Sequence, residues 1–174
     1  ERLGGKPIHF LTECAFFHRT TGEGEDIYQH EPPIKVEQFV LNEHYRTKYQ
    51  GELWDTGAAR VSTVGKCQVE AYLREFPRTK IDWKSGSVEI IFGSNSATSA
   101  IGTMEMENQL GKITYHILDT ATPFLLSLHD ADRLKAYYNN VEDVIVQQDG
   151  STIPVVRKWG HPFFNTGPQE QAVY

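Results

Sequence analysis

The chain has 174 residues, of which 39% are hydrophobic and 23% charged, and its formal net charge is -6 at pH 7. These values predict one soluble globular domain with an ordinary core, and they argue against a chain devoted to nucleic-acid binding. The longest apolar runs are too short to span a membrane. Because two cysteines do not make a disulfide framework, we expect a reducing, cytoplasmic compartment.

Residues 1–50 are the least regular part of the sequence. We expect one short element at 8–18, an exposed loop rich in Gly, Glu, Asp and Pro at 20–33, and a short strand at 39–41. This part is therefore interpreted as an N-terminal lead or extension. Since residue 1 is Glu and no signal-peptide pattern follows it, the chain is expected to be a piece of a longer polypeptide.

Three residues of this lead, His9, Cys14 and His18, are of the types that bind metal ions. They lack the close Cys-x-x-Cys or His-x-x-x-His pairs that fix zinc in proteins. We therefore expect packed or surface residues here, with no metal site and no cofactor.

One carboxylate stands where a predicted buried strand ends. Asp55 lies in the run Leu-Trp-Asp-Thr-Gly-Ala-Ala at 53–59. A carboxylate at such a place is costly to ionise, so its pKa is adjustable and it can do proton chemistry. Thr56 offers a hydroxyl, Gly57 permits a tight turn, and the alanines leave room for another backbone. The alternative interpretation is a turn residue that caps backbone amides.

The elements that follow alternate between helical and strand patterns. Residues 60–64 fit a strand or a loop leaving the site, and 67–76 have apolar residues at helical spacing up to Pro77. From residue 81 the period becomes two. The segment 93–102 is small, polar and bracketed by glycines, which predicts the mobile tip of a β-hairpin.

The last third of the chain predicts a hairpin at 103–118 and a second apolar strand at 122–126. Ser127 and Asp130 form an S-x-x-D capping box that begins a helix. The helical spacing continues to Tyr138, and the two asparagines at 139–140 are predicted to close the helix in a left-handed cap.

The chain is then predicted to end in strands and a tail. Two apolar runs flank Asp149-Gly150, which is a strong hairpin-turn signal. Residues 166–174 are polar, and we expect them to form a frayed tail.

This order of elements resembles the retropepsin family, the aspartic proteases of retroviruses and retrotransposons. The matches are the Asp-Thr-Gly strand end, the glycine-bracketed hairpin and the second apolar strand with its helix. The runs DTGAA-x-x-ST at 55–63, TPFLL at 122–126, D-x-DRL-x-x-YYNN at 130–140 and VRKWGHP at 156–162 look like fungal retrotransposon polyproteins. The run HFLTE at 9–13 is similar to the segment that precedes the protease there.

The resemblance implies a mainly β fold over residues 51–165: a retropepsin-like closed β-barrel or acid-protease half-fold with one or two short helices, completed as a homodimer. It implies an aspartic endopeptidase that cleaves a retrotransposon polyprotein, in the cytoplasm or in virus-like particles. The implied catalytic residues are Asp55, Thr56 and Gly57. The implied substrate-binding residues, in the catalytic loop and the hairpin tip or flap, are Ala58, Ala59, Gly93, Ser94, Asn95, Ser96 and Ala97.

Aspartic proteolysis needs two carboxylates that share one proton around a water. This chain contains one Asp-Thr-Gly, and its nearest imitation, Asp119-Thr120-Ala121, lacks the glycine and follows a hairpin end. We therefore expect the second aspartate to come from a second copy of the chain, across a C2 axis. Residues 155–164 are candidates for the strands of that dimer.

Departures from the family keep two other functions open. Trp54 replaces the usual aliphatic residue before the acid, Ala59 stands where many relatives have Ser or Asp, and Ser127 stands where many have Gly. One alternative is an inactive retropepsin fold that serves as a dimerisation or peptide-binding module. Another is nucleic-acid binding, but the basic residues are sparse and the acidic balance opposes it.

Overall fold

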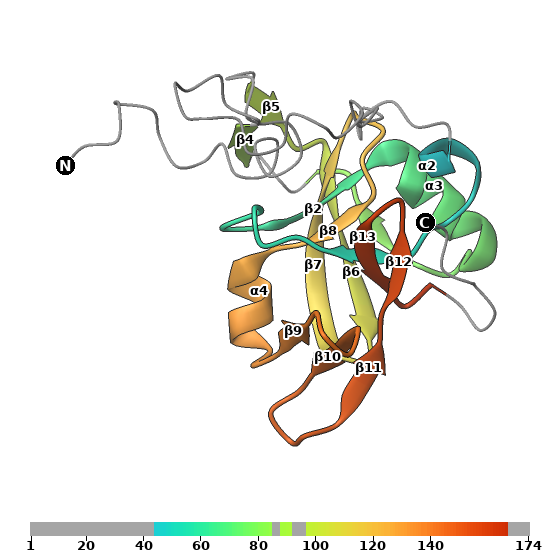
Figure 1. The fold of residues 1–174 in the computed structure, drawn as a ribbon. Helices are drawn as coiled ribbons and strands as arrows, with labels where there is room; N and C mark the ends of the chain where they lie inside the picture. The colour runs from blue at the N-terminus through green and yellow to red at the C-terminus, as the bar shows by residue number, and fades with distance from the viewer. Residues whose placement is uncertain (1–43, 85–87, 92–96, 167–174) are drawn as a thin grey trace, which may run out of the picture.

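The computed structural model describes residues 44–84, 88–91 and 97–166 (Figure 1). Several expectations lie outside the described residues, among them the element at 8–18, the loop at 20–33, the strand at 39–41 and the tail from 167. The same holds for the metal-type residues of the lead, His9, Cys14 and His18.

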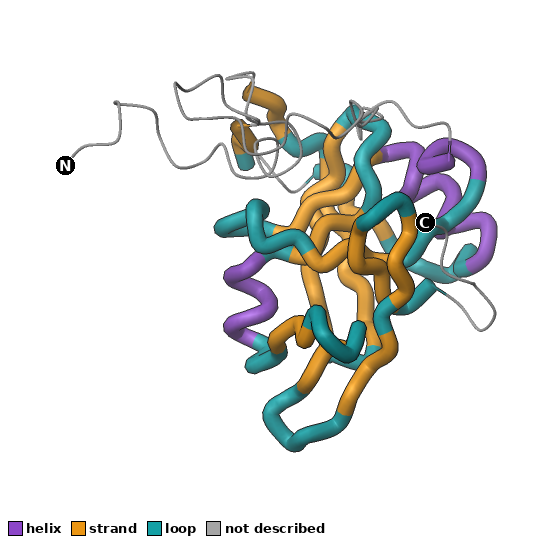
Figure 2. The backbone as a smooth tube through the Cα atoms, in the orientation of Figure 1, coloured by secondary structure: helices purple, strands orange, loops and turns teal. Residues whose placement is uncertain are grey.

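The described chain is mainly β, with few helices, which confirms the predicted class (Figure 2). The helices are α2 (His44–Thr47), α3 (Lys66–Glu75) and α4 (Leu128–Arg133). The strands are β1 (Glu52–Trp54), β2 (Ser62–Gly65), β3 (Ile81–Asp82), β4 (Glu89–Ile91), β5 (Ala97–Ser99), β6 (Gly102–Asn108), β7 (Gly111–Leu118), β8 (Phe124–Leu126), β9 (Tyr137–Asn139), β10 (Val144–Val146), β11 (Thr152–Pro154), β12 (Val156–Lys158) and β13 (His161–Phe164).

Eight of these strands form one sheet in the order β12-β13-β1-β8-β2-β7-β6-β3. The arrangement at its centre positions the candidate site. Strand β8 lies between β1 and β2, parallel to β1 and antiparallel to β2, so the two strands that flank the Asp55 loop are separated by a strand from much later in the chain. Two further sheets, β11-β10-β9 and β4-β5, are smaller.

The closed barrel that we predicted does not form among the described residues. The large sheet ends at β12 on one side and at β3 on the other, and these edge strands do not pair with each other. Closure requires edge strands long enough to pair at a suitable tilt and stagger. Strand β3 has only two residues, both of which are already paired with β6, and β12 has three. The sheet is therefore open.

The main core is formed by residues of α3 and by residues on one face of the large sheet. Val64, Ile113, Ile117 and Phe124 have no exposed surface. Alternate residues of β6 and β7 point inward, as the period-two pattern predicts. On the other face of β1, a smaller cluster is formed by Tyr45, Leu53, Leu125 and Phe163.

The packing begins before residue 51, where we placed the domain boundary. The Gln68 side chain on α3 is fully buried, and its Nε2 donates to the carbonyl oxygens of Tyr45 and Lys48 at 2.5 and 2.7 Å. Its Oε1 accepts from the Gln50 N–H at 3.1 Å. The Tyr49 ring is buried in the main core. Residues 45–50 are thus held by the domain.

Most predicted elements are confirmed. Helix α3 falls within a residue of its predicted bounds, β6 and β7 form the predicted hairpin, and β8 is the second apolar strand. Strands β10 and β11 pair on either side of Asp149-Gly150, and Gly150 has the positive φ (84°) that its turn requires. The Ser127 hydroxyl accepts from the Asp130 N–H, which confirms the predicted cap of α4.

The predicted continuation of α4 to Tyr138 is wrong. The helix ends at Arg133, and the left-handed residue that follows is Lys135, with φ 52°, rather than an asparagine at 139–140. Residues 137–139 form β9, which pairs with β10. The tyrosines fall at helical spacing by coincidence, and pairing with a nearby strand overrides a short helical pattern.

Candidate active site

Asp55 directly follows β1 and is 7% exposed. Its backbone N–H donates to the Leu126 carbonyl at the end of β8, at 3.2 Å, which continues the parallel pairing of the two strands into the loop. On the far side of the turn, the Leu128 N–H donates to the Ala58 carbonyl at 2.8 Å. The Asp55 loop is therefore fixed on the segment between β8 and α4.

The two oxygens of the Asp55 carboxylate have different surroundings. Oδ1 accepts from the Gly57 N–H at 2.9 Å, as in a turn that an aspartate caps. Oδ2 is buried and has no hydrogen-bond partner within the described part of the chain. Burial raises the pKa of Asp55 above its ordinary value, and the backbone N–H groups of Gly57 and Ala58 offset part of this effect. A carboxyl group with one unpartnered oxygen and a raised pKa is suited to holding a proton.

The remaining loop residues that we predicted lie beside Asp55 in the turn. Thr56 and Ala59 are exposed, and Gly57 and Ala58 are half-buried. The Thr56 side chain therefore faces away from the core of its own chain, where a second molecule could reach it.

Trp54 lies in the main core, 8% exposed, with its ring 6.5 Å from that of Phe164 in an edge-to-face arrangement. The indole next to Asp55 is therefore accommodated by packing with β13. The volume of the ring is taken up by the core.

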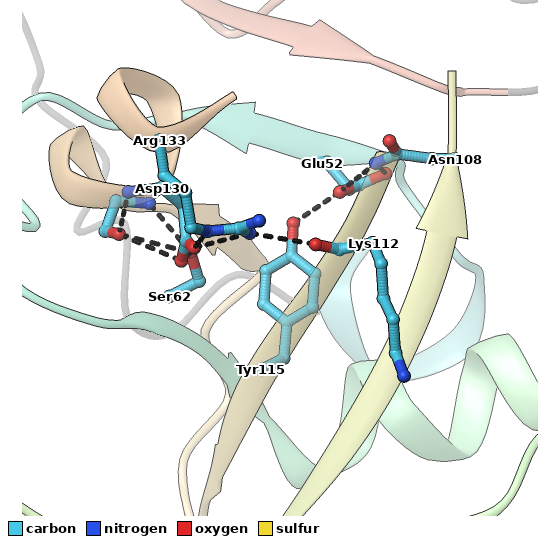
Figure 3. Close-up of polar contacts among 8 residues, drawn as sticks. Glu52, Ser62, Asn108, Lys112, Tyr115, Asp130 and Arg133 are labelled. Atoms are coloured by element: carbon cyan, nitrogen blue, oxygen red, sulfur yellow. Dashed lines mark hydrogen bonds and ion pairs between the residues drawn. The ribbon is translucent and has the colours of Figure 1, made fainter. Parts of the chain in front are cut away.

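A buried polar group behind the loop joins β2 to α4. Asp130 Oδ2 accepts from the Ser62 hydroxyl at 2.6 Å, and the Ser62 Oγ accepts from the Ser127 N–H at 3.0 Å. The guanidinium of Arg133 donates to Asp130 Oδ1 at 2.8 Å and also to the Lys112 carbonyl at 2.8 Å (Figure 3). Burial raises the pKa of Asp130, but the hydrogen bonds of the two serines and the Arg133 guanidinium hold that pKa below its ordinary value.

The hairpin predicted to form a flap is partly described. Strands β4 and β5 pair antiparallel, with Ile91 opposite Ala97. Ala97 is exposed at the start of β5. The other predicted flap residues, Gly93, Ser94, Asn95 and Ser96, lie outside the described residues.

Asp119 does not approach the Asp55 loop. Strand β2 begins at Ser62, near that loop, and ends at Gly65, which is opposite Leu118 of β7. Asp119 follows Leu118 and therefore lies at the other end of β2, where it lines a cleft of about 290 Å³ with Cys67 and other residues. A larger cleft, of about 630 Å³, lies between α3, β3 and the β6–β7 hairpin, and Asp55 lines neither cleft.

Sequence reasoning missed a further buried carboxyl group, on the strand that leads to Asp55. Glu52, the first residue of β1, is 0% exposed. Asn108 Nδ2 donates to both of its oxygens at 2.8 Å, and the Tyr115 hydroxyl donates to Oε2 (Figure 3). Asn165 Nδ2 donates to Oε1 at 3.0 Å. The sequence did hold one signal for this group, because Glu52 is a charged residue within a strand predicted to be buried. Nothing in the sequence, however, relates Glu52 to its distant partners.

The pH dependence of stability should reveal Glu52. Burial raises the pKa of its carboxyl group, and the hydrogen bonds from Tyr115, Asn108 and Asn165 offset part of this effect. The titratable groups near it are Tyr115, Tyr49 and Tyr72. A folded-state pKa above the unfolded value of 4.5 gives stability that is complete below pH 4.5 and is lost as the pH rises through the folded-state pKa.

We therefore expect the wild type to lose stability relative to Glu52→Gln as the pH rises above 4.5, because glutamine does not ionise. Denaturant unfolding of both proteins over a series of pH values measures this difference. The prediction would be contradicted if the difference in the free energy of unfolding stayed constant with pH, or if the wild type became more stable relative to the variant as the pH rose.

Among the described residues, no three His, Cys, Asp or Glu side chains gather in a way that could hold a metal ion. Every described helix is too short or too polar to cross a membrane. No family model, no curated protein and no solved structure matches this chain.

Proposed function

We propose that this chain is a retropepsin-like aspartic endopeptidase that cleaves a retrotransposon polyprotein. The observation that carries the proposal is the Asp55 carboxyl group at the end of a buried strand, with a raised pKa and with one buried oxygen that lacks a partner. Strand β8 lies between β1 and β2 and holds the Asp55 loop that joins these two strands. This placement supports the same conclusion.

The proposed enzyme is a C2 homodimer in which each protomer supplies one Asp55. Asp119, the nearest imitation of a second catalytic loop in the same chain, lies at the far end of β2. Two Asp55 carboxyl groups across the axis would share one proton, because two like charges so close do not both ionise. The exposed Thr56 of each loop is available to contact the partner loop.

In this proposal the ionised member of the pair removes a proton from a water, and the water oxygen attacks the peptide carbonyl carbon. The protonated member gives its proton to the carbonyl oxygen. As the C–N bond breaks, the proton taken from the water is given to the leaving nitrogen, and the former carbonyl oxygen returns its proton to the pair. The hairpin of β4 and β5 would close over an extended peptide and exclude bulk water.

A cleavage assay tests this proposal. The purified chain is incubated at about pH 5 with a peptide that spans a domain junction of the polyprotein, because paired carboxyl groups share a proton in the mildly acid range. We expect cleavage that pepstatin, an aspartic-protease inhibitor, blocks and that a metal chelator does not affect. Specific activity should fall on dilution as dimers dissociate. No cleavage by concentrated, demonstrably dimeric protein would contradict the enzymatic proposal and leave a dimerisation or peptide-binding module.

A further inference from the structure

Glu52 occupies an unusual position for a charged side chain. Its carboxyl group is fully buried, and in the described part of the chain its hydrogen-bond partners are two asparagines and a tyrosine, with no basic group among them. An unpaired buried carboxylate is costly, so a side chain of this kind persists only where its hydrogen bonds do something that an apolar residue would not.

The partners of Glu52 come from parts of the fold that the sheet keeps apart. Asn108 ends β6 and Tyr115 lies in the middle of β7, whereas Asn165 directly follows β13. In the sheet, β1 neighbours β13 but is separated from β7 by β8 and β2. The Glu52 side chain therefore bridges the two halves of the curled sheet through its interior, as Figure 3 shows for Asn108 and Tyr115.

The same strand carries the candidate catalytic group. Strand β1 has only three residues, and Asp55 follows directly after its last one. All three of its residues pair with β8 and the first two with β13, so its place along the sheet is set by only a few ladder hydrogen bonds on each side. A side chain anchored at its first residue therefore has a large share in setting where its last residue lies.

We propose that Glu52 is a positioning residue for Asp55: its buried carboxyl group braces β1 against the β6–β7 hairpin and so fixes where the Asp55 loop stands. The effect of Glu52 on catalysis rests on the proposed function. The effect of Glu52 on how firmly the Asp55 loop is held can be tested without an activity assay.

The test compares Glu52→Gln with the wild type. Glutamine keeps the shape but replaces one accepting oxygen with an NH2 donor, which faces the Asn108 amide together with either Tyr115, at Oε2, or Asn165, at Oε1. Hydrogen–deuterium exchange should rise roughly ten-fold at the amides of Asp55 and Ala58, while the amides of β10 are unchanged. If the chain is a protease, kcat should fall roughly ten-fold with KM nearly unchanged, because a small misplacement of a reacting group lowers the rate of the chemical step.

Two further variants make the result decisive. Glu107→Gln removes an exposed carboxylate from the same hairpin and should change neither readout. Tyr115→Phe removes one donor from the opposite side of the brace while its ring stays against Phe124, so it should repeat the Glu52→Gln pattern more weakly, even if Glu52→Gln does not fold.

A wild type without protease activity would overturn the proposed function, and the exchange experiment would still decide the role of Glu52. Faster exchange confined to the Asp55 loop in Glu52→Gln, or in Tyr115→Phe, supports the brace. Exchange that is unchanged in both variants, or raised equally in β10, would overturn it.

Discussion

Asp55→Asn should abolish the proposed peptide cleavage, with a loss of roughly 10⁴-fold or more in kcat, and should leave the proposed dimer intact. Asparagine keeps the shape of the side chain and can still accept the Gly57 N–H, so the loop geometry is preserved. It cannot hold or release a proton, so the pair loses its shared proton. Peptide cleavage at mildly acid pH and sedimentation of the variant measure the two effects.

Asp119→Asn is the matched control for this experiment. It makes the same chemical change at an exposed aspartate, at the end of β2 remote from the Asp55 loop. We expect its kcat and KM to equal those of the wild type. A loss of activity comparable to that of Asp55→Asn would instead mean that Asp119 supplies the second carboxylate within one chain.

The second large effect, on stability, should come from the buried Asp130 carboxylate, which joins β2 to α4. Asp130→Ala removes the carboxylate that accepts from the Ser62 hydroxyl and from the Arg133 guanidinium. Lost hydrogen bonds of this kind, together with a weakened start of α4, should lower the free energy of unfolding by roughly 3 kcal/mol. Denaturant unfolding at neutral pH measures the loss.

Asp132→Ala controls for the loss of an acidic side chain from the same helix, because Asp132 is exposed. Its effect on the free energy of unfolding should be about 0.5 kcal/mol or less. Equal stabilities of the two variants would show that the Ser62–Asp130 hydrogen bond contributes nothing, and that the Asp55 loop is held by its backbone contacts alone.

The sequence could predict the elements whose signals are local. The end of β1 at Asp55, the Ser127 cap of α4 and the turn at Asp149-Gly150 each follow from residues within a few positions of one another. Where two local signals compete, prediction fails: Tyr137 and Tyr138 have helical spacing, yet pairing with β10 makes them a strand.

Contacts between distant residues were beyond such reasoning. The insertion of β8 between β1 and β2 depends on pairings across more than half of the described chain, and the open sheet follows from edge strands too short to close it. The buried carboxyl group of Glu52 has partners at 108, 115 and 165. No periodicity or spacing relates these positions, because only the folded sheet brings them together.

The proposal that each chain contributes half of an active site is tested most directly by mixing. Wild type and Asp55→Asn are combined in varying proportions at constant total concentration, and cleavage is measured after the subunits have exchanged. If both Asp55 carboxyl groups of a dimer are required, activity follows the square of the wild-type fraction, and an equal mixture retains about one quarter of the wild-type rate. Activity that falls in direct proportion to the wild-type fraction would show that each chain holds a complete site, and would contradict the account.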